Sequence, residues 1–338
     1  MNTGLLARTL KAVAFCMLCL IGLSSCVHEF PKLPERRDVT LHIHHELPWS
    51  LFYFNLPARS TGVGEGTAVG YTFEIYPHGN TEFCLERIHF DSPDISLADF
   101  SRNISIPVGH YDVWVWSDYI DSDSGKSLFY DSANFGGIKL TEPYRGDTYQ
   151  KDAFQGMVEV NVPDTDKVSL DIEAEVVLRR PLTGYALIAD DLNEFIEQET
   201  RRLSPEDPAP LHAPVLDFSK YTARVTYTGY IPYLYSMFRN KPIDSMLGVS
   251  YEGRIELTES GDAILAFDTA FINGDESTLT MALEVFDDKG VMLSSMGGIV
   301  IPTKRNRATI VRAAFLTTKA QGGVNIDTSF TNDFNIKI

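Results

Sequence analysis

Alternating apolar and polar residues are the main feature of the chain, and this pattern of period two predicts β-strands. In residues 168–178, Leu170 and Ile172 fall on one face, while Asp171 and Glu173 fall on the other. A strand of this kind has one buried and one solvated face, as in an antiparallel sheet. Similar patterns predict strands at residues 39–45, 71–76, 110–117, 182–189, 223–228, 248–257, 264–271 and 309–316.

A β-hairpin is predicted near the C-terminal end of the chain. Two apolar runs, residues 279–286 and 291–296, flank the sequence Asp-Asp-Lys-Gly at residues 287–290. A short polar turn that ends in glycine favours reversal of the chain between two paired strands.

Only one segment has helical spacing. Leu192, Phe195 and Ile196 share a helical face, and Asp190 is suited to cap the start of that helix. Many strands with a single short helix predict an all-β fold built from two tandem antiparallel β-sandwiches. The domain break is predicted at Arg180, where one clean strand ends and a new one begins, and this gives domains of residues 38–180 and 181–338.

The N-terminus has the pattern of an export signal. Arg8 and Lys11 precede an uncharged apolar run at residues 12–23, which is typical of a signal peptide. The run ends in Leu-Ser-Ser-Cys, which resembles the lipobox of bacterial lipoproteins. That resemblance implies a cleaved signal peptide of residues 1–25 and acyl chains, palmitate among them, on Cys26, which would hold the protein in a membrane. A plain cleaved signal with a chance cysteine is the alternative.

Residues 26–37 are predicted to be a lipidated tether, because Pro31 and Pro34 favour an extended chain. Glu29 weakly resembles the acidic export signal of surface lipoproteins of the Bacteroidota. We therefore expect a lipid-anchored protein of the outer membrane, exposed at the cell surface, while the choice between inner and outer leaflet stays open.

Charge and cysteine content narrow the class of protein. The 338 residues include 29 basic and 46 acidic side chains, a formal net charge of −17. Such a charge argues against a nucleic-acid partner and against electrostatic docking on anionic lipid. Cleavage before Cys26 leaves only that residue and Cys84, so no intrachain disulfide framework is expected. Cys84, in a strand-like run at residues 83–85, is expected to be a small buried hydrophobe.

Trp114 and Trp116 alternate on one predicted strand, on the same face as Asp112 and Asp118. Tryptophans beside carboxylates can form a platform for a sugar ring, but tryptophans are more often part of a core. The pair is therefore a possible ligand platform, with a core position as the favoured alternative.

Candidate metal residues carry weaker signals. His42 and His44 point to one face of a predicted strand but match no zinc signature, and a solvated face is favoured. Asp118, Asp121 and Asp123 lack the spacing of an EF-hand, and a polar turn explains them equally well. The sequence contains neither an HExxH nor a GxSxG motif. We therefore predict no metal, no cofactor, no catalytic residues and no enzymatic activity.

Several segments give the chain a family resemblance. It resembles the fimbrillin-like lipoproteins of the Bacteroidota, which include fimbrial anchor and accessory subunits. The resemblance implies two transthyretin-like β-sandwiches, an outer-membrane lipoprotein, and fimbrillin-like protein partners that assemble by strand addition. It rests on CVHEFP at residues 26–31, VGHYDVWVWSDYID at 108–121, KDAFQG at 151–156, LRRPLTGYALIADDLNEF at 178–195, IPTKRNRATIVRAAFLTT at 301–318 and GGVNIDTSF at 322–330.

The C-terminal sequence FTNDFNIKI alternates through Phe334, Ile336 and Ile338 and could be a strand donated to a partner, although pairing within its own domain is favoured. The leading hypothesis is a non-enzymatic surface lipoprotein that acts in fimbria assembly or adhesion through protein–protein contacts. The alternative is a glycan-binding surface lipoprotein that uses Trp114 and Trp116 as an aromatic platform. A metal-dependent enzyme around His42 and His44 is a third, less favoured reading.

Overall fold

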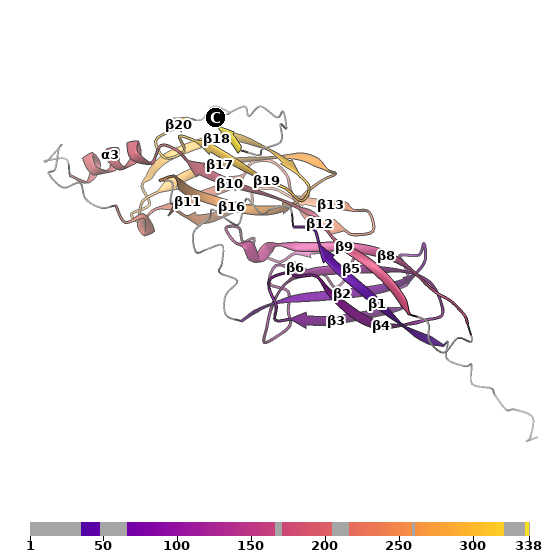
Figure 1. The fold of residues 1–338 in the computed structure, drawn as a ribbon. Helices are drawn as coiled ribbons and strands as arrows, with labels where there is room; N and C mark the ends of the chain where they lie inside the picture. The colour runs from indigo at the N-terminus through magenta and orange to yellow at the C-terminus, as the bar shows by residue number, and fades with distance from the viewer. Residues whose placement is uncertain are drawn as a thin grey trace, which may run out of the picture.

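The computed structural model describes residues 35–47, 66–165, 171–204, 216–258, 261–320 and 335–337. These residues form β-strands in two lobes that follow one another along the chain (Figure 1), with one α-helix, α3 (Leu192–Leu203), at the far end of the second lobe. This confirms the predicted all-β sandwich fold, with a single α-helix among the described residues. No helix among the described residues is long and apolar enough to cross a membrane.

The first lobe is a sandwich of two sheets, and its strand β1 (Arg36–His45) shows the alternation of buried and exposed side chains expected when one face lies on the core. In β1, Val39, Leu41 and Ile43 are fully buried, while His42 and His44 lie on the outer face. The three-stranded sheet has the order β4 (Phe100–Pro107), β1 (Arg36–His45) and β9 (Ile172–Leu178), and the four-stranded sheet has the order β3 (Glu86–Ser92), β2 (Thr67–Pro77), β5 (Gly109–Asp121) and β8 (Ala153–Val162).

The second lobe is a larger sandwich of two five-stranded sheets. Its core includes Leu187, Val225, Leu265, Leu283 and Val311 from both sheets. One sheet has the order β15 (Glu256–Leu257), β16 (Ala263–Phe271), β10 (Leu182–Ala189), β19 (Ala308–Ala313) and β21 (Asn335–Lys337). The other has the order β14 (Ser250–Arg254), β11 (Thr222–Tyr227), β17 (Glu276–Phe286), β18 (Met292–Lys304) and β20 (Lys319–Ala320).

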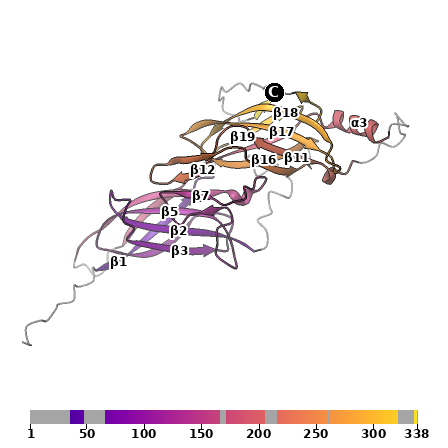
Figure 2. The same cartoon turned by 180° about the vertical axis from the view of Figure 1, so that it is seen from behind.

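A further sheet is shared by the two lobes. It has the order β13 (Lys241–Met246), β12 (Ile231–Ser236), β7 (Ile138–Leu140) and β6 (Tyr130–Asp131). Antiparallel pairing of Leu234 with Lys139 and of Tyr235 with Ile138 joins a hairpin of the second lobe to a strand of the first. Seen from behind, β12 of the second lobe lies directly over β7 and β5 (Figure 2). Main-chain hydrogen bonds therefore connect the lobes.

Two short 3-10 helices, η2 (Tyr149–Lys151) and η3 (Phe218–Lys220), complete the elements. Two local predictions need correction. The predicted strand at residues 248–257 is two strands, β14 and β15, interrupted at Ile255. The N-cap of α3 is Asp191 and not Asp190, and the Asp191 carboxylate accepts hydrogen bonds from the backbone of Leu316 and Thr317 instead of from the helix.

Candidate functional site

Segments that carry the family resemblance meet between the two lobes. Lys151 and Asp152 lie at the end of η2, immediately before β8 of the first lobe, and Arg180 lies in the connection from β9 to β10. All three charged side chains are almost completely buried, with at most 2% of each exposed. Charged residues this deeply buried are rare unless they are paired, and each of these three has a partner of opposite charge.

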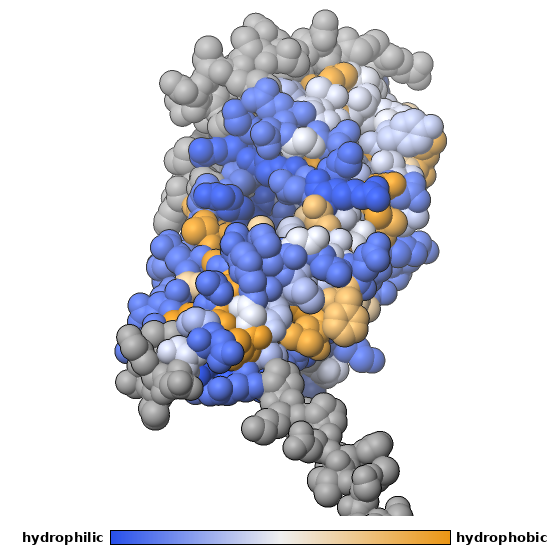
Figure 3. Space-filling view, turned by 90° about the vertical axis from the view of Figure 1, so that its right-hand side faces the viewer, coloured by the Kyte–Doolittle hydropathy of each residue, from blue (hydrophilic) through white to orange (hydrophobic). Residues whose placement is uncertain are grey.

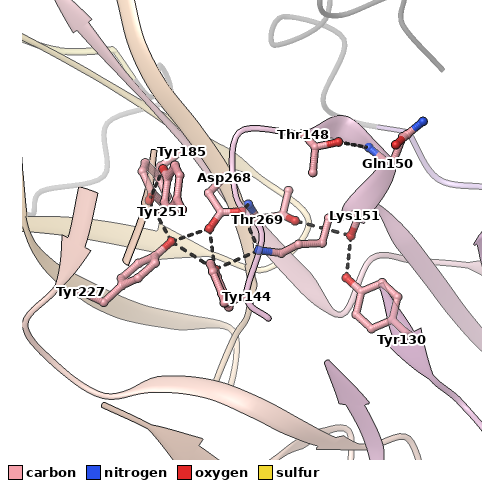
Figure 4. A network of polar contacts seen from close by, with 10 residues as sticks. All are labelled: Tyr130, Tyr144, Thr148, Gln150, Lys151, Tyr185, Tyr227, Tyr251, Asp268 and Thr269. Carbon is pink, nitrogen blue, oxygen red and sulfur yellow. Dashed lines mark hydrogen bonds and ion pairs between the residues drawn. The ribbon is translucent and has the colours of Figure 1, made fainter. Parts of the chain in front are cut away.

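Lys151 of the first lobe pairs with Asp268 of β16 in the second lobe (Figure 4). Lys151 Nζ lies 2.6 Å from Asp268 Oδ1, which also accepts the backbone N–H of Thr269 at 2.8 Å. The Oδ2 atom accepts the hydroxyls of Tyr144 at 2.5 Å and of Tyr227 at 2.7 Å. Four donors therefore occupy the roughly four acceptor positions of this carboxylate, so that its burial leaves no oxygen unsatisfied.

Hydroxyl groups extend this network into both lobes. Tyr185 Oη lies 2.8 Å from both Tyr227 Oη and Tyr251 Oη, and Tyr130 donates to the backbone carbonyl of Lys151 at 2.5 Å. Burial raises the pKa of these tyrosines well above its usual value, so their hydroxyls stay protonated and can donate. Burial lowers the pKa of Lys151, while the adjacent Asp268 carboxylate opposes that shift.

The second buried pair joins Arg180 to Asp152. Arg180 Nε and Nη2 approach the two carboxylate oxygens at 2.8–2.9 Å, a bidentate arrangement that fixes both side chains. Arg180 Nη1 also donates to Asn306 of the second lobe at 3.3 Å, and the guanidinium lies over the ring of Phe154. The connection between the two sandwiches is therefore fixed by ionic contacts and by packing.

Each lobe also extends a segment onto the other. The first lobe sends out residues 141–152, where Asp147 donates its backbone N–H to Phe267 and Tyr149 stacks on the ring of the same residue. The second lobe sends out the β12–β13 hairpin, whose Phe238 packs against Tyr76 and Trp114 of the first lobe. We call this reciprocal exchange, the shared sheet and the two ion pairs the clasp. The clasp predicts that the two lobes move as one body.

The predicted platform tryptophans lie beneath this clasp. Trp116 is fully buried against Tyr130, and Trp114 is half-buried against Phe238. A glycan platform requires both indoles to be exposed in a groove. Trp116 is instead part of the core between the lobes, because the β12–β13 hairpin and β6 cover its face of the sheet.

The predicted lipidation residue, Cys26, lies outside the described residues. Cys84 is half-buried and lies in an irregular segment before β3, so the prediction that it belongs to a strand is wrong. Its thiol donates to the backbone carbonyl of Glu86, and burial raises the pKa of the Cys84 thiol. A raised pKa keeps the sulfur protonated and disfavours nucleophilic chemistry.

The carboxylates of the polar turn do not converge. Asp118 points into the protein and accepts a hydrogen bond from Ser127, whereas Asp121 accepts from the backbone and hydroxyl of Ser124 in a solvent-exposed turn. Burial raises the pKa of Asp118 to about 7. This geometry is that of a turn and not of a calcium loop.

His42 and His44 do share the outer face of β1, as predicted. Each imidazole lies beside carboxylates of neighbouring strands or loops, such as Glu173 for His42 and Asp99 for His44, at 3.8 and 2.9 Å. Among the described residues, the group that brings three metal-binding side chains together contains neither His42 nor His44. It consists of His78, His110 and Glu159. Sequence reasoning missed this group because its members are 32 and 49 residues apart and come from separate strands.

Sheet edges are the candidate contact surfaces for other proteins, since an edge strand leaves backbone groups free to pair with an added strand. In the first lobe, β3 and β4 are edge strands, and in the second lobe β14 and β15 are. On the opposite side of the second lobe, β21 pairs in parallel with β19, where Ile336 lies opposite Val311. The C-terminal strand thus pairs within its own domain, as favoured from the sequence.

The surface of the protein also carries exposed apolar side chains. Figure 3 shows a face that is mostly hydrophilic, with apolar residues in small separate patches. Three exposed large apolar side chains, Tyr230, Ile243 and Leu247, lie on or beside the β12–β13 hairpin.

Comparison with solved structures gives several matches, all at low identity. The chain is similar to a protein of Bacteroides thetaiotaomicron described as one of the "putative polysaccharide binding proteins", with 10% identity, 77% of this chain and 80% of the other covered, and a TM-score of 0.45. It is also similar to the fimbrial anchor protein Mfa2 of Porphyromonas gingivalis, with 11% identity, 77% of this chain and 82% of the other covered, and a TM-score of 0.39. The tip fimbrial protein Mfa3 of the same organism matches with 8% identity, 82% of this chain and 94% of the other covered, and a TM-score of 0.40.

Two of these three neighbours carry fimbrial names. A search of curated proteins gave no match. One family model matches residues 34–338, which include both lobes and the clasp. The chain therefore belongs to the family described as "Family of unknown function (DUF6562)".

Proposed function

We propose that the protein is a non-enzymatic, lipid-anchored surface protein that acts as an anchor or accessory subunit of a fimbria-like polymer through protein–protein contacts. The observation that carries the proposal is a lipobox-like cysteine, Cys26, shortly before the first strand of two interlocked β-sandwiches. Acyl chains on Cys26 would supply membrane attachment, and the sandwiches would supply a stiff body that transmits force to that attachment.

The direction of β1 gives this body a polarity. β1 begins at Arg36 and runs toward the junction, where the next residue after the strand, Glu46, pairs with Arg179 at 2.6 Å. The ten residues from Cys26 to Glu35 can reach at most about 35 Å. An acylated Cys26 would therefore hold the first lobe near the membrane, and the second lobe, with α3 at its far end (Figure 1), would point away from it.

The edge of the second lobe beside β19 is the contact that we assign to a partner subunit. β21, a strand of three residues, occupies this edge in parallel with β19, and a strand from another subunit could replace it with the same main-chain hydrogen bonds. β14 and β15 are each the outermost strand of their own sheet, and among the described residues neither has a strand on its outer side, so these two edges are the second candidates.

The experiment compares cells that carry the wild-type gene, a gene deletion, a Cys26→Ala variant and a chain ending at residue 330. Electron microscopy would count surface fibres and measure their length and their attachment to cells. We expect fibres to be lost, or shed into the medium, in the deletion and in Cys26→Ala, and fibre number or length to change in the truncated variant. Fibres unchanged in number, length and attachment after deletion would contradict the proposal.

A further inference from the structure

We infer that His78, His110 and Glu159 form a surface binding site for a divalent transition-metal ion such as Zn²⁺. His110 belongs to β5 and Glu159 to β8, and His78 directly follows β2, so the three residues lie on or at the end of three neighbouring strands of one sheet. One ligand atom from each residue lies within 4.8 Å of the other two. This site is separate from the clasp and from the strand edges of the proposed function.

The register of the strands explains why these side chains meet. The backbone N–H of His78 donates to the carbonyl of His110, which places these residues opposite each other. Asp112 and Glu159 are directly paired across β5 and β8. His110 and Asp112 are two residues apart on one strand, so all four side chains project from the same face of the sheet.

Asp112 provides the second observation that points to a ligand. Its buried carboxylate accepts His78 Nδ1 at 2.7 Å and the backbone N–H of Gly79 at 2.9 Å. A carboxylate that receives Nδ1–H fixes the tautomer of the imidazole and leaves Nε2 with a free lone pair, which is the arrangement found behind metal-binding histidines. Asp112 therefore acts as a positioning residue for His78.

The remaining two residues, His110 and Glu159, are in contact with each other. His110 Nε2 lies 2.5 Å from Glu159 Oε1, and the imidazoles of His78 and His110 stack with their centroids 4.0 Å apart. A bound ion would replace the proton shared between His110 and Glu159. Because 43–57% of each of the three side chains is exposed, they can rotate toward the metal–ligand distances of about 2.0–2.2 Å that zinc requires.

Two nitrogen ligands and one carboxylate favour a borderline metal such as zinc over magnesium or calcium, which prefer oxygen ligands. Three protein ligands leave a coordination position for water. The site lies on the same face of the sheet as Trp114. Phe238 of the second lobe packs on Trp114 and on Tyr76, and Tyr76 is paired with Asp112, so the site lies next to this packing contact.

The test is calorimetric titration of Zn²⁺ into the full mature chain carrying Cys26→Ala, so that a free N-terminal thiol does not compete. We expect one ion per chain, with the Kd raised at least roughly tenfold by His78→Ala and by His110→Ala. The matched controls are His42→Ala and His44→Ala, two equally exposed histidines of β1, which should leave the Kd unchanged. Circular dichroism would verify that all variants are folded.

A second measurement separates the positioning residue from the ligands. Asp112→Asn should weaken Zn²⁺ binding by about 10- to 100-fold without changing the stoichiometry, because the three ligands remain. Absence of Zn²⁺ binding to the parent chain would overturn the inference. So would a Kd that His78→Ala and His110→Ala leave unchanged, or one that the His42→Ala control alters by the same factor.

Discussion

The buried Lys151–Asp268 pair gives the sharpest stability prediction. Lys151→Met removes the positive partner and leaves the Asp268 carboxylate at 0% exposure, whereas Asp268→Asn leaves an unpaired ammonium group at 1% exposure. Breaking a buried ion pair from one side costs roughly 3–5 kcal/mol, because the remaining charge has neither water nor counter-ion. We expect each single variant to lose about that much of the free energy of unfolding.

The double variant Lys151→Met/Asp268→Asn should recover a large part of this loss. The asparagine carbonyl can still accept the hydroxyls of Tyr144 and Tyr227, which now donate to Asp268 Oδ2. No unpaired charge remains buried, so the double variant should lose less than the sum of the two single losses. We expect a coupling free energy of about 2–3 kcal/mol, within the range observed for directly contacting residues.

Urea unfolding monitored by tryptophan fluorescence and far-UV circular dichroism measures these values. The clasp also predicts that the two lobes of the wild-type protein unfold in a single transition, since each contributes a segment to the other. Single-variant losses below about 1 kcal/mol would refute the reasoning that the pair is desolvated. Additive losses in the double variant would refute the assigned contact.

Two further predictions concern close packing and pH. Gly146→Ala places a Cβ atom 2.6 Å from the ring of Tyr251 and should lower the free energy of unfolding by about 1–3 kcal/mol. In the control, Gly137→Ala, the new Cβ atom meets nothing closer than 3.6 Å, so the free energy of unfolding should change little. Equal losses in the two variants would contradict the packing. The pKa of Asp118 is about 7 in the folded state against an ordinary 3.8. Between about pH 4 and pH 7 the folded state therefore keeps a proton on this carboxyl that the unfolded state releases, so the free energy of unfolding falls as the pH rises through that window. Asp118→Asn should therefore gain stability over wild type across that window, by up to roughly 4 kcal/mol in urea unfolding, and a pH-independent difference would contradict it.

Much of the fold could be predicted because alternation is a local property of the sequence. β1 and the β17–β18 hairpin are clear in the sequence, since each has one face against the core, whereas β10 is buried on both faces and shows as a short run without charged residues. β12 and β13 were not predicted, because Pro232 and Pro242 interrupt their pattern and because β7, the other partner of β12, is almost a hundred residues away. Strands that pair across lobes have no short-range signal.

The same reason limits prediction of sites. The segments that contain Lys151 and Arg180 stand out as motifs, but nothing local shows that Asp268 and Asn306 are their partners. Trp114 and Trp116 suggest a binding platform because alternation shows that they share a face, but it does not show what covers that face. The His78, His110 and Glu159 group depends on strand register, which only the three-dimensional structure provides.

The central claim of the proposed function is that Cys26 is acylated and holds the protein on the membrane. The most direct measurement is growth of cells with an alkyne-labelled palmitate, followed by purification of this protein and detection of the label. The account predicts label on the wild-type chain and none on Cys26→Ala. An unlabelled wild-type chain, or equal labelling of the two, would contradict it.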